Sequence, residues 1–209
     1  MHPPAALPLL CEQAMQTGRA IDLKGCDYGP HKTSGKFYGP QPYYHFLAGL
    51  VRTLGFRKIL EIGTNYGGSI LAIDRGCGGP QPGVELVTID KIDIACPALI
   101  ALPHIKRICR PSLAPQALAE AATHLHHPID LLYIDSKHTY DETHGNFTTY
   151  GAAFHPRLVI LDDIHLNPDM ERIWREMTQR FAHRAFDATH LSERKDGFGI
   201  LDIPAETWA

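Results

Sequence analysis

Acidic residues follow two apolar stretches in the second half of this 209-residue sequence, and they have the clearest potential for chemistry. Asp135 follows the stretch at 129–134, and Asp162 and Asp163 follow the stretch at 157–161. If the two stretches are neighbouring parallel strands, the three carboxylates repel one another unless a cation lies between them. Oxygen ligands of this kind favour a hard divalent ion. We therefore predict a metal site, most economically for Mg²⁺, at these three residues.

The adjacency of Asp162 and Asp163 restricts how both side chains can reach one ion. Neighbouring residues of a regular strand point to opposite faces of the sheet. The two carboxylates therefore converge only if the strand has already given way to a loop at this point. Neither aspartate is needed to cap the following helix, because Asn167 and Pro168 form a favourable N-cap and first-turn pair.

A glycine-bearing turn lies within the segment 58–74, whose sequence is KILEIGTNYGGSILAID. A strand, a tight turn and a helix start in this order bring backbone N–H groups close to a nucleotide-like ligand. The spacing E-x-G-x-x-x-G-G differs from the dinucleotide fingerprint, which disfavours a nicotinamide-dependent dehydrogenase. The next strand is followed by Asp90, which is placed to accept hydrogen bonds from ribose hydroxyls.

The elements that must position these residues alternate along the chain. Strands are predicted at 58–62, 84–89, 104–108, 129–134 and 157–161. Helices are predicted at 5–17, 42–54, 67–75, 95–102, 112–124, 139–150 and 167–181. Thr139 and Glu142 have the spacing of a capping box, which predicts a helix start at Thr139. Two further strands, at 184–190 and 197–203, are joined by a loop with Asp196-Gly197, a hairpin signal. The pattern predicts an α/β fold with a mostly parallel sheet, helices on both faces and a C-terminal antiparallel hairpin.

Composition excludes several classes of protein. The formal net charge of −3 provides no basic field for nucleic acid, and no apolar run is long enough to span a membrane. The five cysteines are odd in number and contain no C-x-x-C pair, which favours reduced thiols in a cytoplasmic protein. The N-terminal helices are plausible contacts of a homodimer.

Together these motifs resemble the class I S-adenosylmethionine-dependent methyltransferases. The glycine turn is similar to their first motif, and a sheet that ends in a hairpin is their sheet form. The acidic strand ends resemble the metal-dependent O-methyltransferases of the catechol and caffeoyl-CoA type. They resemble even more closely the small-molecule and sugar methyltransferases related to cephalosporin hydroxylase, in which IDSKHTYDE matches a segment I-D-G-x-H-x-Y.

The resemblance implies a Rossmann-like three-layer sandwich with a seven-stranded sheet. It also implies one methyltransferase domain over 1–209, with N-terminal helices and a cap segment at 1–55 and a catalytic core at 56–209. Within the first part, the glycine- and aromatic-rich segment 25–45 resembles a region that helps to cover cofactor and substrate. Long connections of this kind are often functional.

The resemblance further implies roles for individual residues around S-adenosylmethionine. Glu61 and Gly63 would lie near the methionine part, Asp90 would hold the ribose, and Lys91 and Ile92 would flank the adenine. The implied cofactor-binding set is Glu61, Gly63, Thr64, Asn65, Tyr66, Gly67, Ser69, Asp90, Lys91, Ile92, Ser112 and Asp135.

The catalytic base is open between two residues. Catechol-type enzymes carry a lysine base three residues after the first metal ligand. Here His138 occupies that position, and the lysine, Lys137, lies one residue earlier. His138 could equally be a metal ligand or a bystander, and His165 is expected to be structural or to face the substrate.

The expected function is methyl transfer from S-adenosylmethionine to a hydroxyl of a small molecule, assisted by a divalent ion. The sulfonium is already a strong electrophile, so the protein mainly aligns the reacting atoms. The alternatives are a metal-independent methyltransferase, or a cephalosporin-hydroxylase-like enzyme with different chemistry. A non-catalytic S-adenosylmethionine-binding partner protein is disfavoured, because it would gain nothing from three repelling carboxylates.

Overall fold

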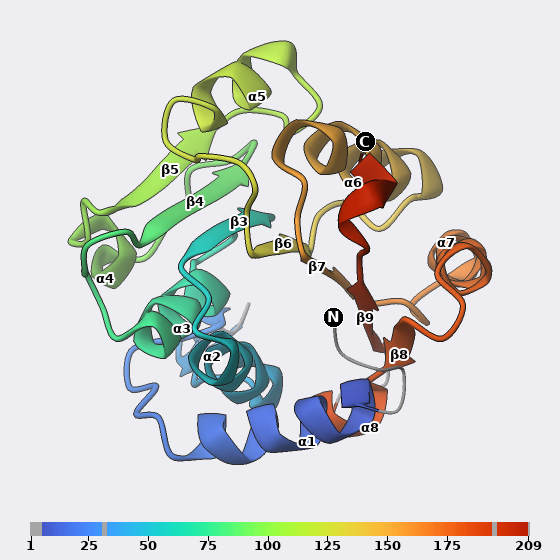
Figure 1. The fold of residues 1–209 in the computed structure, drawn as a ribbon. Helices are drawn as coiled ribbons and strands as arrows, with labels where there is room; N and C mark the ends of the chain where they lie inside the picture. The colour runs from blue at the N-terminus through green and yellow to red at the C-terminus, as the bar shows by residue number, and fades with distance from the viewer. Residues whose placement is uncertain (1–5, 31–32, 194–195, 209) are drawn as a thin grey trace.

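A mixed β-sheet forms the centre of the computed structural model, which describes residues 6–30, 33–193 and 196–208 (Figure 1). Within these residues the sheet has seven strands in the order β5-β4-β3-β6-β7-β9-β8. The strands are β3 (Lys58–Ile62), β4 (Glu85–Asp90), β5 (Ile105–Cys109), β6 (Leu131–Ile134), β7 (Leu158–Asp162), β8 (Ala185–Asp187) and β9 (Phe198–Asp202). The first five are parallel, and β9 pairs antiparallel with both β7 and β8. The predicted parallel sheet with its antiparallel C-terminal strands is therefore confirmed.

Helices cover both faces of this sheet, as Figure 1 shows. They are α1 (Ala6–Arg19), α2 (Pro42–Leu54), α3 (Gly68–Cys77), α4 (Pro97–Ile100), α5 (Pro115–Ala121), α6 (Tyr140–Phe154), α7 (Pro168–Arg180) and α8 (Thr189–Ser192). One apolar core joins α1, α2 and α3 to the sheet, and a second core lies between the other face and α5, α6 and α7. The three-layer arrangement follows from this division.

Strand β6 shows why both faces must be covered. Leu131 and Tyr133 pack into the first core, whereas Leu132 and Ile134 pack into the second. Successive side chains of a strand point to opposite faces, so a strand that is apolar throughout is stable only between two layers of helices. Because β3, β4, β6 and β7 are parallel, their carboxyl ends lie at one edge of the sheet, which is where open α/β sheets bind ligands.

Several predicted elements differ in extent from the observed ones. The helices predicted at 95–102 and 112–124 are shorter, because each begins at a proline that suits the first helical turn, Pro97 and Pro115. Residue 5 of the first predicted helix and residues 31–32 of the segment 25–45 lie outside the described residues.

Three local features were not foreseen from the sequence. The segment 25–45 contains two short antiparallel strands, β1 (Gly29–Pro30) and β2 (Phe37–Tyr38). The connection between β8 and β9 holds the short helix α8, so it is longer than a tight hairpin turn. Helix α6 begins after Thr139 as predicted, but this threonine makes no side-chain capping hydrogen bond.

The composition also led to expectations about the cysteines and about membrane-spanning helices. All five cysteines are free thiols. Among the described residues, no helix combines the length and the hydropathy that crossing a membrane requires.

Candidate active site

The glycine turn after β3 presses directly on the backbone that follows β6. Gly63 has a φ of 108°, and a Cβ atom at this position would lie 1.7 Å from the carbonyl oxygen of Asp135. The Gly63 N–H donates to the carbonyl of Ile89 in β4, 2.8 Å away. Only glycine allows both the conformation and the contact. The turn therefore joins the ends of three strands, and it places Asp135 beside the predicted nucleotide-binding loop.

Glu61 lies beneath this turn, and its side chain is fully buried. Its two carboxylate oxygens accept hydrogen bonds from Ser69 of α3 and Thr88 of β4, each at 2.5 Å. Thr64 in turn bonds to the Thr88 hydroxyl at 2.6 Å. Burial raises the pKa of Glu61 to about 8, although the two hydrogen bonds oppose that rise. Glu61 thus fastens the turn to α3 and β4 from below, and its predicted place near the methionine part of the cofactor stays a prediction.

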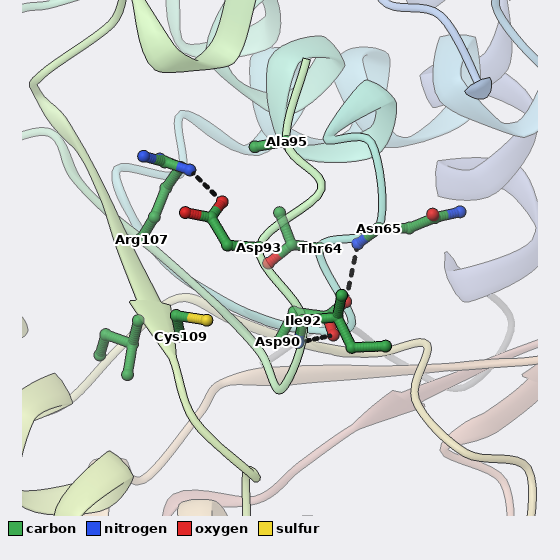
Figure 2. Close-up of a pocket in the computed structure, with 9 residues that line it drawn as sticks. Thr64, Asn65, Asp90, Ile92, Asp93, Ala95, Arg107 and Cys109 are labelled. Atoms are coloured by element: carbon green, nitrogen blue, oxygen red, sulfur yellow. Dashed lines mark hydrogen bonds and ion pairs between the residues drawn. The ribbon is translucent and has the colours of Figure 1, made fainter. Parts of the chain in front are cut away.

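Asp90 at the end of β4 holds the other side of the turn. Its Oδ2 atom accepts a hydrogen bond from the backbone N–H of Asn65 at 2.8 Å, and its Oδ1 atom accepts one from Ile92 at 3.1 Å (Figure 2). The recess drawn in Figure 2 has a volume of about 50 Å³, and an ion pair between Arg107 and Asp93 closes part of its rim. Carboxylate oxygens fixed in this way keep lone pairs available to further donors.

A larger cavity of about 330 Å³ is also lined by Asp90. Its wall contains six of the residues singled out from the sequence, namely Gly63, Asp90, Lys91, Ser112, Asp135 and Lys137. It also contains Ser136 and Glu142, which sequence reasoning did not assign to the site. The capping pattern predicts the place of Glu142 in the first turn of α6, but it does not predict that Glu142 also lines the cavity.

Four side chains that could hold a cation meet next to this cavity. They are Asp135 after β6, His138 in the same loop, and Asp162 and Asp163 at the end of β7. One donor atom from each lies within 4.8 Å of all the others. Asp162 is fully buried and Asp163 is 6% exposed. The structure therefore brings together the three predicted carboxylates and adds an imidazole to them.

Asp163 reaches this cluster because the strand ends at it. Its φ is 56°, in the left-handed region, and its backbone N–H donates to the carbonyl of Gly197 at 3.0 Å. Such a conformation turns the chain out of the pleat, so the carboxylates of Asp162 and Asp163 no longer point to opposite faces. The requirement that the strand break between these two residues is thus confirmed.

The loop that carries His138 is fastened to the start of α7. The Asn167 Nδ2 atom donates to the carbonyl oxygen of His138 at 2.9 Å, while its Oδ1 atom accepts from the backbone N–H groups of Asp169 and Met170. The predicted N-cap of α7 is therefore confirmed, and the same side chain also positions His138.

Tyr133 supports Asp135 from within the core. Its hydroxyl donates to the Oδ2 atom of Asp135 at 3.2 Å. Burial raises the pKa of Tyr133 well above its usual value, and the charge of Asp135 adds to this effect, so the hydroxyl remains a donor. The sequence contained a signal for this contact, because residues two apart on a strand lie on the same face.

The remaining predicted residues lie around the turn or beside the cluster. The Tyr66 ring makes an edge contact with Phe37 of β2, which sets the short β1–β2 ladder against the turn. Gly67 has a φ of 93° and directly precedes α3. His165 contacts Asp187 at 2.7 Å, so it links the loop after β7 to the end of β8.

No family model and no curated protein matches the sequence of this chain. Solved structures match its fold. An O-methyltransferase from Bacillus cereus in complex with SAH is 20% identical, with a TM-score of 0.57, over 93% of this chain and 91% of that chain. The O-methyltransferase TomG from Streptomyces achromogenes, involved in tomaymycin synthesis and in complex with SAM, is 21% identical, with a TM-score of 0.55, over 95% and 90%.

A third match contains a metal. The methyltransferase MycE of the mycinamycin biosynthetic pathway, in complex with Mg, SAH and mycinamycin VI, is 15% identical with a TM-score of 0.53. That match covers 77% of this chain and 47% of the MycE chain.

At the sequence identities of these three matches, the likeness is one of fold. The chain has the fold of the class I S-adenosylmethionine-dependent O-methyltransferases, as its sequence motifs predicted.

Proposed function

We propose that this protein transfers a methyl group from S-adenosylmethionine to a hydroxyl of a small molecule, with the help of a divalent metal ion. The proposal rests on the place of Asp135 between the cavity and the acidic cluster. This residue lines the cavity next to Gly63 and Asp90, and it also belongs to the cluster with Asp162 and Asp163. A cofactor site and a metal site therefore share one wall.

The cavity suits S-adenosylmethionine because it is lined by an open glycine turn and a fixed carboxylate acceptor. Gly63 leaves no side chain between the turn and the ligand, and Asp90 presents a carboxylate whose position is fixed by two backbone N–H groups. Ser112 also lines the cavity, and its carbonyl accepts a hydrogen bond from the Tyr150 hydroxyl at 2.5 Å. Once bound, the cofactor supplies a methyl group on a sulfonium, which is already a strong electrophile.

The acidic cluster suits a divalent cation. Its carboxylates lie close together and two of them, Asp162 and Asp163, are buried, an arrangement that mutual repulsion opposes unless a positive charge compensates it. Asp135, Asp162 and Asp163 would hold the ion. A divalent ion held there would lower the pKa of a hydroxyl bound to it and help to position its oxygen.

The side chains of the protein then have two tasks. Tyr133 and Asn167 keep Asp135 and the His138 loop in place, so that the acceptor hydroxyl meets a rigid wall. Lys137 or His138 takes the hydroxyl proton. With S-adenosylmethionine bound, the deprotonated oxygen would accept the methyl group, and S-adenosylhomocysteine would be the other product.

The proposal is tested by incubating the chain with S-adenosylmethionine and a panel of catechol, flavonoid, sugar and antibiotic hydroxyl acceptors. Formation of S-adenosylhomocysteine and of a methylated product is measured with and without EDTA. We expect transfer to at least one acceptor, loss of turnover in EDTA, and loss of turnover in Asp135→Asn with cofactor binding largely retained.

Other results would contradict the proposal in distinct ways. Turnover that persists in EDTA would identify a metal-independent methyltransferase. Tight cofactor binding without transfer to any acceptor would favour a cephalosporin-hydroxylase-like enzyme or a partner protein that only binds the cofactor. Tight binding of NADH in place of S-adenosylmethionine would favour a dehydrogenase.

A further inference from the structure

His138 stands farther from its carboxylates than the other histidines that pair with acids in the described part of the chain. The imidazoles of His104, His165 and His126 lie 2.7, 2.7 and 2.9 Å from Asp74, Asp187 and Glu85, respectively. The Nε2 atom of His138 instead lies 3.4 Å from Asp135 and 3.3 Å from Asp163. The Nε2 atom of His138 thus lies at nearly the same distance from a carboxylate oxygen of Asp135 and one of Asp163.

These two distances are longer than a charge-assisted hydrogen bond, which spans about 2.7–2.9 Å. They agree with the separation of neighbouring ligands on one metal ion. Ligand atoms about 2.1–2.4 Å from an ion, at right angles to each other, lie about 3.0–3.4 Å apart, and opposite ligands lie about 4.2–4.8 Å apart. The four donor atoms of the cluster lie within 4.8 Å of one another, so the set of distances fits one ion.

The imidazole is held in this place by the surrounding chain. Asn167 fixes the backbone carbonyl of His138, and the backbone N–H of Tyr140 donates to the carboxylate of Asp169 at 3.1 Å, which ties the same loop to α7 a second time. The His138 side chain is 23% exposed. Contacts of this kind hold a metal ligand in the position that its ion requires.

We propose that His138 is a metal ligand, so that the centre consists of three carboxylates and one imidazole. This inference rests on the metal site of the proposed function and specifies its ion. Mg²⁺ strongly prefers oxygen ligands, whereas an imidazole suits first-row transition metals. The centre therefore selects Mn²⁺ or a neighbouring transition metal over Mg²⁺. Lys137, in the wall of the cavity, then takes the hydroxyl proton.

The test measures metal binding without any methyl acceptor. The metal-free chain is titrated calorimetrically with Mn²⁺ and with Mg²⁺, and the Mn²⁺ complex is examined by pulsed electron paramagnetic resonance for coupling to a directly bound ¹⁴N nucleus. For the wild type we expect this coupling and a Kd for Mn²⁺ at least tenfold lower than that for Mg²⁺.

Two variants complete the design. His138→Gln should abolish the ¹⁴N coupling and raise the Kd for Mn²⁺ at least tenfold, with less than a threefold change for Mg²⁺. The matched control is His144→Gln, because His144 lies in α6 and stacks on Tyr140 away from the cluster. This control should leave both metals and the coupling unchanged.

The outcomes separate this inference from the proposed function. Binding of Mn²⁺ and Mg²⁺ with equal affinity and no ¹⁴N coupling in the wild type would overturn the role of His138 and leave an all-oxygen metal site. Failure of the wild type to bind either ion would overturn both. The wild-type spectrum decides the question even if the His138 variant does not fold.

Discussion

Asp162 and Asp163 are neighbours in the sequence, yet each places a carboxylate oxygen in the same cluster, because Asp163 has a φ of 56°. In a regular strand the two side chains would lie on opposite faces of the sheet. The end of β7 is therefore shaped by two requirements, a left-handed backbone and a negative charge, and these can be separated by mutation.

Asp163→Asn is expected to keep the backbone and lose the charge, because asparagine tolerates the left-handed region about as well as aspartate. Its thermal stability without metal should equal or exceed that of the wild type, since one repelling charge is gone, while its Kd for Mn²⁺ should rise at least tenfold. Asp163→Ala should show the same loss of metal binding and be less stable by about 1–2 kcal/mol. Equal stability of the two variants in urea denaturation would show that the backbone conformation carries no cost.

Gly63→Ala should be far more damaging than an ordinary glycine substitution. The new Cβ would lie 1.7 Å from the carbonyl oxygen of Asp135, so the turn and the loop after β6 must separate. Gly79→Ala is a matched control, because Gly79 also has a positive φ, 77°, but has nothing within 4 Å of the added atom. We expect the control to lose about 1–2 kcal/mol of stability. Gly63→Ala should lose clearly more and bind no S-adenosylhomocysteine in calorimetry.

Glu61 should make the protein less stable as the pH rises from about 4.5 to about 8. Burial raises the pKa of this carboxyl to about 8 in the folded chain, from an ordinary value of 4.5. The folded state therefore holds the proton more tightly than the unfolded state. This contribution is complete below the unfolded pKa and is lost as the pH passes through the folded pKa, with a slope of about −1.4 kcal/mol per pH unit between the two values.

The measurement compares urea denaturation of the wild type and Glu61→Gln between pH 5 and pH 9. The difference in their free energies of unfolding should change with this slope, in favour of the variant at higher pH. Glu120→Gln, which alters a surface carboxylate paired with Arg110, should leave the slope of the wild type unchanged. A constant difference between wild type and Glu61→Gln would mean that Glu61 is ionised throughout.

Asp90→Ala should weaken the binding of S-adenosylhomocysteine at least tenfold, because hydrogen bonds to a charged group contribute about 1.5–3 kcal/mol each. Asp93→Ala removes a carboxylate from the same recess, but Asp93 pairs with Arg107 and does not hold the glycine turn. The control should change the Kd less than threefold. Similar losses in both variants would indicate a general effect of negative charge and not a specific contact of Asp90.

The sequence predicted the sheet well because its strands are buried on both faces and appear as short apolar runs between helices. β6 is an example, since Leu131 to Ile134 are all apolar and all buried. Acidic residues that interrupt such runs mark the ends of strands, so Asp90, Asp135 and Asp162 could be located before the fold was known. The short helices α4 and α5 were less predictable, because proline decides where they begin.

The details of the site depended on contacts between distant segments, which residue spacing does not encode. The resemblance implies a place for Glu61 near the cofactor, but only the packing of Ser69 and Thr88 around it shows that its carboxyl is buried. The distance between His138 and Asp163 likewise depends on how Asn167 joins two loops. The capping bond expected of Thr139 does not form, although the helix begins where predicted.

The position of Asp135 in the wall of both proposed sites, the cofactor cavity and the acidic cluster, has a thermodynamic consequence. A ligand that alters the charge or orientation of this carboxylate in one site changes the binding free energy in the other, and such coupling is reciprocal. If bound cofactor changes the Kd for the metal by a given factor, bound metal must change the Kd for the cofactor by the same factor. An increase in affinity would make the protein fill both sites together when both ligands are scarce, whereas a decrease would make each ligand help to expel the other.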